Sequence, residues 1–78
     1  MNRKIKLIWD FRSVDALQIA TNHSQDVRNF ALKNKIQSYD LGTAELSEYH
    51  CISFVVIDES NMILLRDALK PQRAEVAK

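Results

Sequence analysis

The side chains best suited to acid–base chemistry in this chain of 78 residues are its two histidines, His23 and His50. Histidine changes charge near neutral pH, so it can give and take protons during catalysis. Asp10 could orient such a histidine, and Arg12 could anchor an anionic substrate. These residue types allow a small acid–base enzyme of the lyase or isomerase type, with His23 as the acid or base.

A structural role for His23 is the competing interpretation, because it lies in the apolar stripe of an amphipathic helix expected over about residues 14–35. A histidine there can be a core or interface residue whose ring nitrogens are hydrogen-bonded to its neighbours. The alternation of side chains along a strand, here called the parity argument, also separates His23 from Asp10. If the strand that contains Asp10 is regular, that carboxylate points away from the helices while His23 points toward the sheet. The sequence leaves the role of His23 open, and it favours Asp10 paired with a base such as Arg12 or facing a partner subunit.

Further candidates for ligand binding lie around the start of the strand expected at residues 49–57. His50 and Cys51 are neighbours on that strand, so they point to opposite faces and cannot form a Cys–His nucleophile pair. Cys51 is therefore expected to be a small core residue. The predicted ligand-binding residues are Arg12, Tyr49, His50 and Ser53.

Composition excludes several classes of function. Eleven basic and ten acidic residues give a net charge of +1, which does not favour nucleic acid as a partner. The only early apolar run ends at Asp10 and is too short for a secretory signal or a membrane span, so no membrane partner and a cytoplasmic location are expected. One cysteine and two histidines show no metal-site spacing, so we expect neither a metal nor another cofactor.

Five elements are expected along the chain. Period-two alternation predicts a strand over 4–11, and Ser13 is expected to cap the helix that follows. A short strand over 36–41 should end at Gly42, with a turn through 43–48, and the apolar strand 49–57 should be central. Residues 62–70 favour a helix, although a hairpin turning at 58–61 is the alternative. Residues 71–78 are expected to form a polar tail.

These elements predict one small α+β domain over residues 1–78, of the order β-α-β-β-α. Placing the third strand between the first two, antiparallel to both, gives a ferredoxin-like split β-α-β arrangement without a final strand. Both helices then cover one face, and the first strand is an edge. The helix face should carry Ile52, Phe54 and Val56; the uncovered face should carry Ile8, Asp10, Ser38, Asp40, Tyr49, Cys51, Ser53 and Val55.

A homodimer is the expected assembly. A chain this short buries little apolar surface, so its core gives only a small margin of stability. Its single cysteine allows no intrachain disulfide that could add to that stability. The uncovered face is too apolar for bare solvent and too polar for a core, which suits two sheets facing each other around a hydrated cleft.

Two stretches, LIWDFRSVDALQIATNHSQDVRNF and FVVIDESNMILLRDALKPQRAEV, resemble the dimeric α/β barrel superfamily and, within it, the YCII-related proteins. The resemblance implies an acid–base pair, which carries over to His23 and Asp10. The chain departs from the family pattern by its expected lack of a fourth strand and by Gln72 in the segment PQR.

The function that we expect from the sequence is therefore non-enzymatic. The domain would act by homodimerisation and by binding a partner protein or a small anionic ligand on its free sheet face. The acid–base enzyme with its site in the dimer cleft is the alternative.

Overall fold

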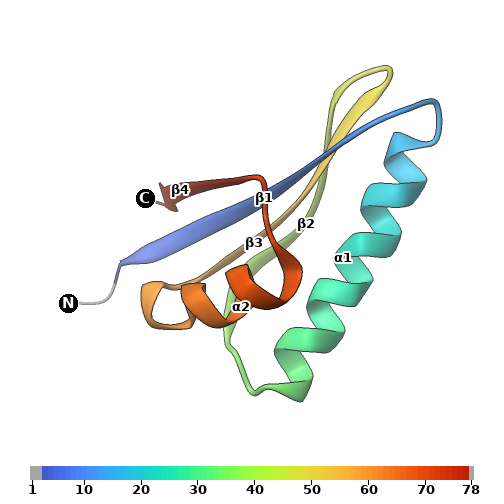
Figure 1. Cartoon of the computed structure of the whole chain (residues 1–78). Helices are drawn as coiled ribbons and strands as arrows, with labels where there is room; N and C mark the ends of the chain where they lie inside the picture. The colour runs from blue at the N-terminus through green and yellow to red at the C-terminus, as the bar shows by residue number, and fades with distance from the viewer. Residues whose placement is uncertain (1–2, 78) are drawn as a thin grey trace.

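The computed structural model describes residues 3–77 and contains four strands and two helices (Figure 1). The order of elements is β1 (Lys4–Arg12), α1 (Ala16–Lys33), β2 (Ser38–Ser47), β3 (His50–Asp58), a 3₁₀ turn (Glu59–Asn61), α2 (Met62–Leu69) and β4 (Arg73–Ala77). The helix predicted over 62–70 is confirmed, and the hairpin alternative is wrong.

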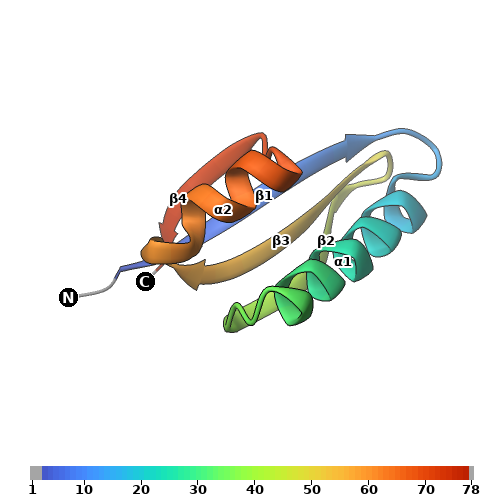
Figure 2. The same cartoon turned by 60° about the horizontal axis from the view of Figure 1, so that its bottom comes forward.

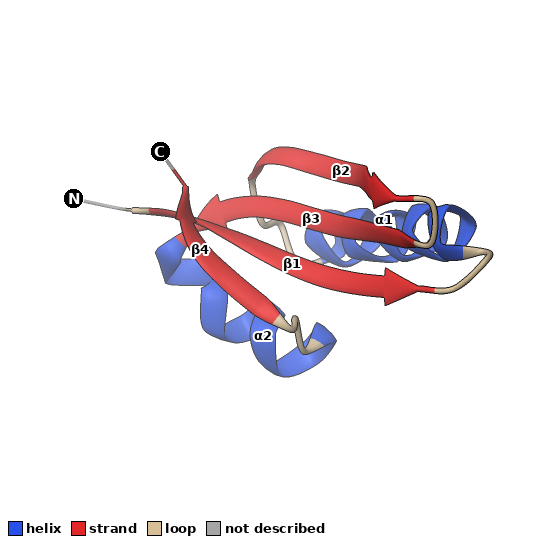
Figure 3. Cartoon of the chain, turned by 90° about the horizontal axis from the view of Figure 1, so that it is seen from above, coloured by secondary structure: helices blue, strands red, loops and turns tan. Residues whose placement is uncertain are grey.

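The four strands form one antiparallel sheet in the order β2-β3-β1-β4. β3 lies between β1 and β2 and is antiparallel to both, as predicted. Figure 3 shows the strands side by side. The predicted α+β class is confirmed.

β4 was not expected, because residues 71–78 were predicted to be a tail after the last element. Residues Arg73 to Ala77 instead pair with β1 from Ile8 back to Lys4; Lys78 lies outside the described residues. An edge strand needs little apolar surface, since its main-chain hydrogen bonds to the neighbouring strand are available to almost any sequence. β1 is therefore an interior strand, and the prediction that it is an edge is wrong.

β2 is longer than predicted and runs through Gly42 instead of ending there. Gly42 lies opposite Phe54 and has no positive φ, so neither a turn nor backbone strain requires glycine at this position. The turn between β2 and β3 is made by Glu48 and Tyr49. Pairing along β3 extends β2 through residues whose own strand propensity is weak.

Both helices pack on the same face of the sheet (Figure 2). Leu65 of α2 and Val27 of α1 meet Leu7 and Val55 of the central strands in one buried cluster. Ile5, Leu7 and Trp9 of β1 all belong to this cluster. Trp9 also donates a hydrogen bond from Nε1 to the carbonyl oxygen of Leu69 (2.8 Å). That bond fixes the end of α2 to β1.

The two faces of β3 are the reverse of the prediction. Register pairs Leu7 with Val55 and Asp10 with Ile52, so Val55 lies on the helix face and Ile52 on the uncovered face. Both faces of β3 are apolar, so period-two alternation could not choose between them, and only pairing with β1 decides. The uncovered face therefore carries Ile8, Asp10, His50, Ile52, Phe54 and Val56.

Helix α1 begins two residues later than expected, at Ala16, and its N-cap position is Asp15 in place of Ser13. Ser13 still stabilises the turn, because its Oγ accepts a hydrogen bond from the backbone nitrogen of Asp15 (3.2 Å). Neither helix of the described chain is both long enough and apolar enough to cross a bilayer.

Candidate functional site

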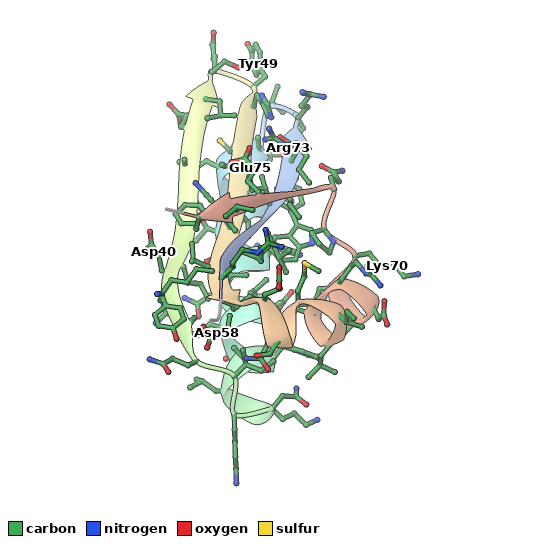
Figure 4. All side chains as sticks on the ribbon, turned by 90° about the vertical axis from the view of Figure 1, so that its left-hand side faces the viewer. Asp40, Tyr49, Asp58, Lys70, Arg73 and Glu75 are labelled. Carbon is green, nitrogen blue, oxygen red and sulfur yellow. The ribbon has the colours of Figure 1, made fainter. Side chains whose placement is uncertain are left out.

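An open pocket of about 490 Å³ lies where β1 ends and β3 begins. Arg12, Tyr49 and His50 contribute to its wall from β1, from the β2–β3 turn and from the first position of β3. Figure 4 shows Tyr49 at this end of the sheet. The remaining lining residues are Ser13, Val14 and Ser47.

Backbone pairing explains why the pocket residues meet. Arg12 and His50 are direct cross-strand partners at the last pair of the β1–β3 ladder. A hydrogen bond from the backbone nitrogen of Ser13 to the carbonyl oxygen of Tyr49 (3.0 Å) then joins the β1–α1 connection to the β2–β3 turn. The structure brings together these residues of the predicted ligand-binding set: Arg12, Tyr49 and His50.

Asp10 lies beside the pocket, and its carboxylate is hydrogen-bonded to two basic side chains. Its Oδ1 accepts a hydrogen bond from His50 Nε2 (2.8 Å), and Arg73 of β4 donates to Oδ2 from Nε and to Oδ1 from Nη2, both at 3.0 Å. The backbone nitrogen of Asp10 donates to Oε1 of Gln72 (2.7 Å). Asp10 thus joins β1 to both neighbouring strands.

The surroundings of Asp10 lower the pKa of its carboxyl group. Burial acts to raise that pKa, but the hydrogen bonds and positive charges of His50 and Arg73 outweigh it. Because an ionised carboxylate can only accept, Nε2 of His50 carries the hydrogen of the bond between them. The Nδ1 atom of His50 has no protein partner among the hydrogen bonds of residues 3–77.

His23 lies on the other face of the sheet and does not meet Asp10. Its Nδ1 is hydrogen-bonded to Oγ of Ser53 (3.0 Å), and its ring packs at 4.7 Å from Trp9 and 5.3 Å from Phe11 between centroids. Burial lowers the pKa of His23, and the nearby Asp26 only partly opposes this. The parity argument that separates His23 from Asp10 is confirmed.

Ser53, the fourth predicted ligand-binding residue, is separated from the other three. Its relative exposure is 0%, and it faces α1 beside His23. A serine within hydrogen-bonding distance of a histidine has the composition of a nucleophile and its base. Ser53 is fully buried, however, so a substrate has no path to its hydroxyl group.

Cys51 is buried, as predicted, and burial raises the pKa of its thiol, with the charge of Glu45 adding to the effect. A thiol held protonated is a weak nucleophile. Within residues 3–77, no cluster of three potential metal ligands occurs.

Arg73 is the site residue that sequence reasoning missed, because residues 71–78 were expected to form a polar tail. Pro71 is the signal that could have found it: proline ends helices, and the alternation in RAEVA is typical of a short strand. The pairing of Asp10 with Arg12, predicted as one alternative, is not formed.

Comparison of the chain with protein-family models, with curated proteins and with solved structures gave no match.

Proposed function

We propose that this chain is a small, non-enzymatic binding domain whose ligand is a small organic anion. The observation that supports this proposal is the convergence of Arg12, Tyr49 and His50 on one open pocket. Asp10 holds Arg73 and His50, whereas none of the ion pairs among residues 3–77 involves Arg12. The guanidinium group of Arg12 is therefore available to bind a carboxylate through two parallel hydrogen bonds.

The pocket also favours a particular kind of anion. Val14 and Tyr49 present exposed apolar surface beside Arg12, with exposures of 79% and 53%, so part of the ligand should be apolar. Arg12 is the one arginine among the described residues that line the pocket, so it matches a single carboxylate. We infer a ligand with a single carboxylate and a short aromatic or alkyl body.

The test is a titration of ¹⁵N-labelled protein with benzoate and hexanoate, and with their uncharged amides as matched controls. We expect amide shift changes at residues 12–14 and 47–50 with the acids. The amides should bind at least about tenfold more weakly, because a hydrogen bond to a charged group is worth about 1.5–3 kcal/mol. Arg12→Met should remove the preference for the acids, whereas Arg66→Met on α2 should keep it. Equal binding of acids and amides would refute the proposal.

We further propose that the fold is ferredoxin-like and that the domain works as a homodimer. The alternation of strands and helices, the strand order β2-β3-β1-β4 and the placement of both helices on one face support the fold assignment. Phe54, half-buried on the uncovered face, supports contact with a second copy. Lys6 opposes it, because its Nζ lies 4.5 Å from the centroid of the Phe54 ring and shields that ring from a partner.

A second candidate function is acid–base catalysis by His50. The observation that favours it is the 2.8 Å contact between His50 and Asp10 beside the pocket, in the arrangement in which a carboxylate orients a catalytic imidazole. His50 takes the place of His23 in this version, because His23 faces the opposite side of the sheet. Turnover of a carboxylate ligand by the wild-type protein, lost in His50→Gln and kept in His23→Gln, would establish it over simple binding.

A further inference from the structure

We propose that β4 exchanges between two copies of the chain, so that the β4 of each copy pairs with the β1 of the other. This inference goes beyond the proposed ligand binding and does not depend on it. It concerns the segment from Gln72 to Ala77 and the edge of β1 that this segment covers.

β4 is held in the sheet by few contacts, and these are almost all with β1. Its main-chain pairing is with β1 alone, and Arg73, Ala74, Glu75 and Val76 are all exposed. Since little apolar surface is buried under β4, detaching it costs little hydrophobic free energy. β4 is the strand of this sheet that can leave without opening the core under α1 and α2.

The contacts of β4 can also form between copies without change. Arg73 binds both carboxylate oxygens of Asp10, and Gln72 donates from its backbone nitrogen to the carbonyl oxygen of Ile8 (3.0 Å) while its side chain accepts from Asp10. None of these bonds requires Gln72 and Asp10 to belong to the same molecule. A partner's β4 can satisfy the same groups in the same register.

The connection between α2 and β4 favours exchange. Leu69 is hydrogen-bonded to Trp9, and Gln72 is hydrogen-bonded to Ile8, so only Lys70 and Pro71 bridge the two elements. Figure 4 labels Lys70 at the end of α2. Lys70 has φ 51° and ψ 65°, a left-handed conformation that disfavours residues with a Cβ atom. Short hinges under strain promote exchange of the segment that follows them, because an extended hinge releases the strain.

The exchange would complete the candidate site in trans. In the exchanged dimer the guanidinium group on Asp10 comes from the second copy, and Asp10 also binds His50, which lines the pocket. The second copy thus supplies a charge next to the binding pocket of the first.

The test traps the pairing covalently. Lys6 and Glu75 are cross-strand partners that face the same side, so the double variant Lys6→Cys/Glu75→Cys, in a Cys51→Ala background, can close a disulfide across β1 and β4. We equilibrate the full chain at millimolar concentration, oxidise it and separate it by denaturing, non-reducing electrophoresis. We expect a covalent dimer band. Oxidised protein that runs only as a monomer would overturn the proposal, even if the native protein is dimeric, because in a dimer formed by the sheet faces each β4 still pairs with the β1 of its own chain.

Two glycine variants test the hinge, and a second cysteine pair guards against misfolding of the first. Lys70→Gly removes the penalty at the left-handed position, and we expect the dissociation constant of the native dimer to rise about fivefold per hinge, hence about 25-fold, by light scattering. Lys35→Gly is the matched control, since Lys35 also has a positive φ (55°) but lies outside the hinge; its dissociation constant should stay within about twofold. Equal effects of the two glycines would refute the role of the hinge. Lys4→Cys/Ala77→Cys repeats the trapping at another facing pair if the first variant does not fold.

Discussion

Asp10 is the most connected polar residue of the uncovered face. Its side chain is only 13% exposed, and its carboxylate accepts from His50 and Arg73. Removing the negative charge would leave Arg73 and His50 next to each other without an anion between them. A buried or half-buried polar group that loses its partner costs more than the bond itself contributed.

Asp10→Asn should lower the free energy of unfolding by about 1–2 kcal/mol at pH 7, discounted because Arg73 is half exposed. The pKa of Asp10 is lowered in the folded state, so its contribution is present above the unfolded-state value near 4 and is lost as the pH falls through the folded-state value. Urea denaturation from pH 7 down to pH 2.5 should show the difference between variant and wild type shrinking. Glu75→Gln, on the same face, is the control without an ion pair among the described residues. A difference independent of pH would contradict this assignment.

The burial of His23 predicts a second loss of folding stability in acid, at a higher pH than the loss caused by Asp10. Burial lowers its folded-state pKa, so the neutral ring stabilises the protein above the unfolded-state value of about 6.5, and that stability is lost as the pH falls toward the folded-state value. NMR titration of the imidazole protons should give a midpoint below 6.5 for His23. His23→Gln should make the free energy of unfolding less dependent on pH between 7.5 and 5, and a midpoint at or above 6.5 would argue against burial as the cause.

At the level of elements, α1 ends in a complete Schellman motif. The backbone nitrogen of Ile36 donates to the carbonyl oxygen of Ala31 (2.8 Å), and that of Lys35 donates to Leu32 (3.3 Å). Ile36 and Ala31 are both in the buried core cluster, which supplies the apolar contact that accompanies such an end. Lys35 occupies the left-handed position that glycine usually takes in this motif.

Lys35→Gly should therefore raise the free energy of unfolding by about 0.5–1 kcal/mol, because glycine has no Cβ penalty at positive φ. Gln25→Gly, on the exposed side of α1, should lower it by a similar amount, since glycine is a poor helix former. Chemical denaturation of both variants measures the two effects. The same sign for both substitutions would mean that the left-handed position of Lys35 carries no strain.

At the level of the whole molecule, the sheet has one face covered by helices and one face without them. Leu7 and Ile8 are neighbours on β1 with exposures of 0% and 3%, but only Leu7 packs in the core cluster beneath the helices. Leu7→Ala should cost about 3–4 kcal/mol, as in other closed cores. Ile8→Ala should cost about 1–2 kcal/mol, because no helix packs over Ile8 and its neighbours can relax into the space that the substitution leaves. Equal losses in thermal and urea denaturation would indicate that a second layer covers the uncovered face in solution.

The sequence by itself determined the local structure where apolar residues lay on only one face of an element. Period-two alternation identified β1 as a strand, helical periodicity identified α1, and the pattern over residues 62–70 identified α2. The placement of β3 between β1 and β2 followed from its apolar character on both faces. Parity alone separated His23 from Asp10.

Only the tertiary structure decided which strands pair and in what register. Because β3 is apolar on both faces, its register against β1 was needed to place His50 beside Asp10 and Ser53 beside His23. β4 and the second half of β2 have weak propensities of their own, and main-chain pairing with a neighbour makes them strands. Arg73 reached the site for the same reason: a residue 63 positions from Asp10 in sequence is brought to it by a backbone pairing that local pattern does not encode.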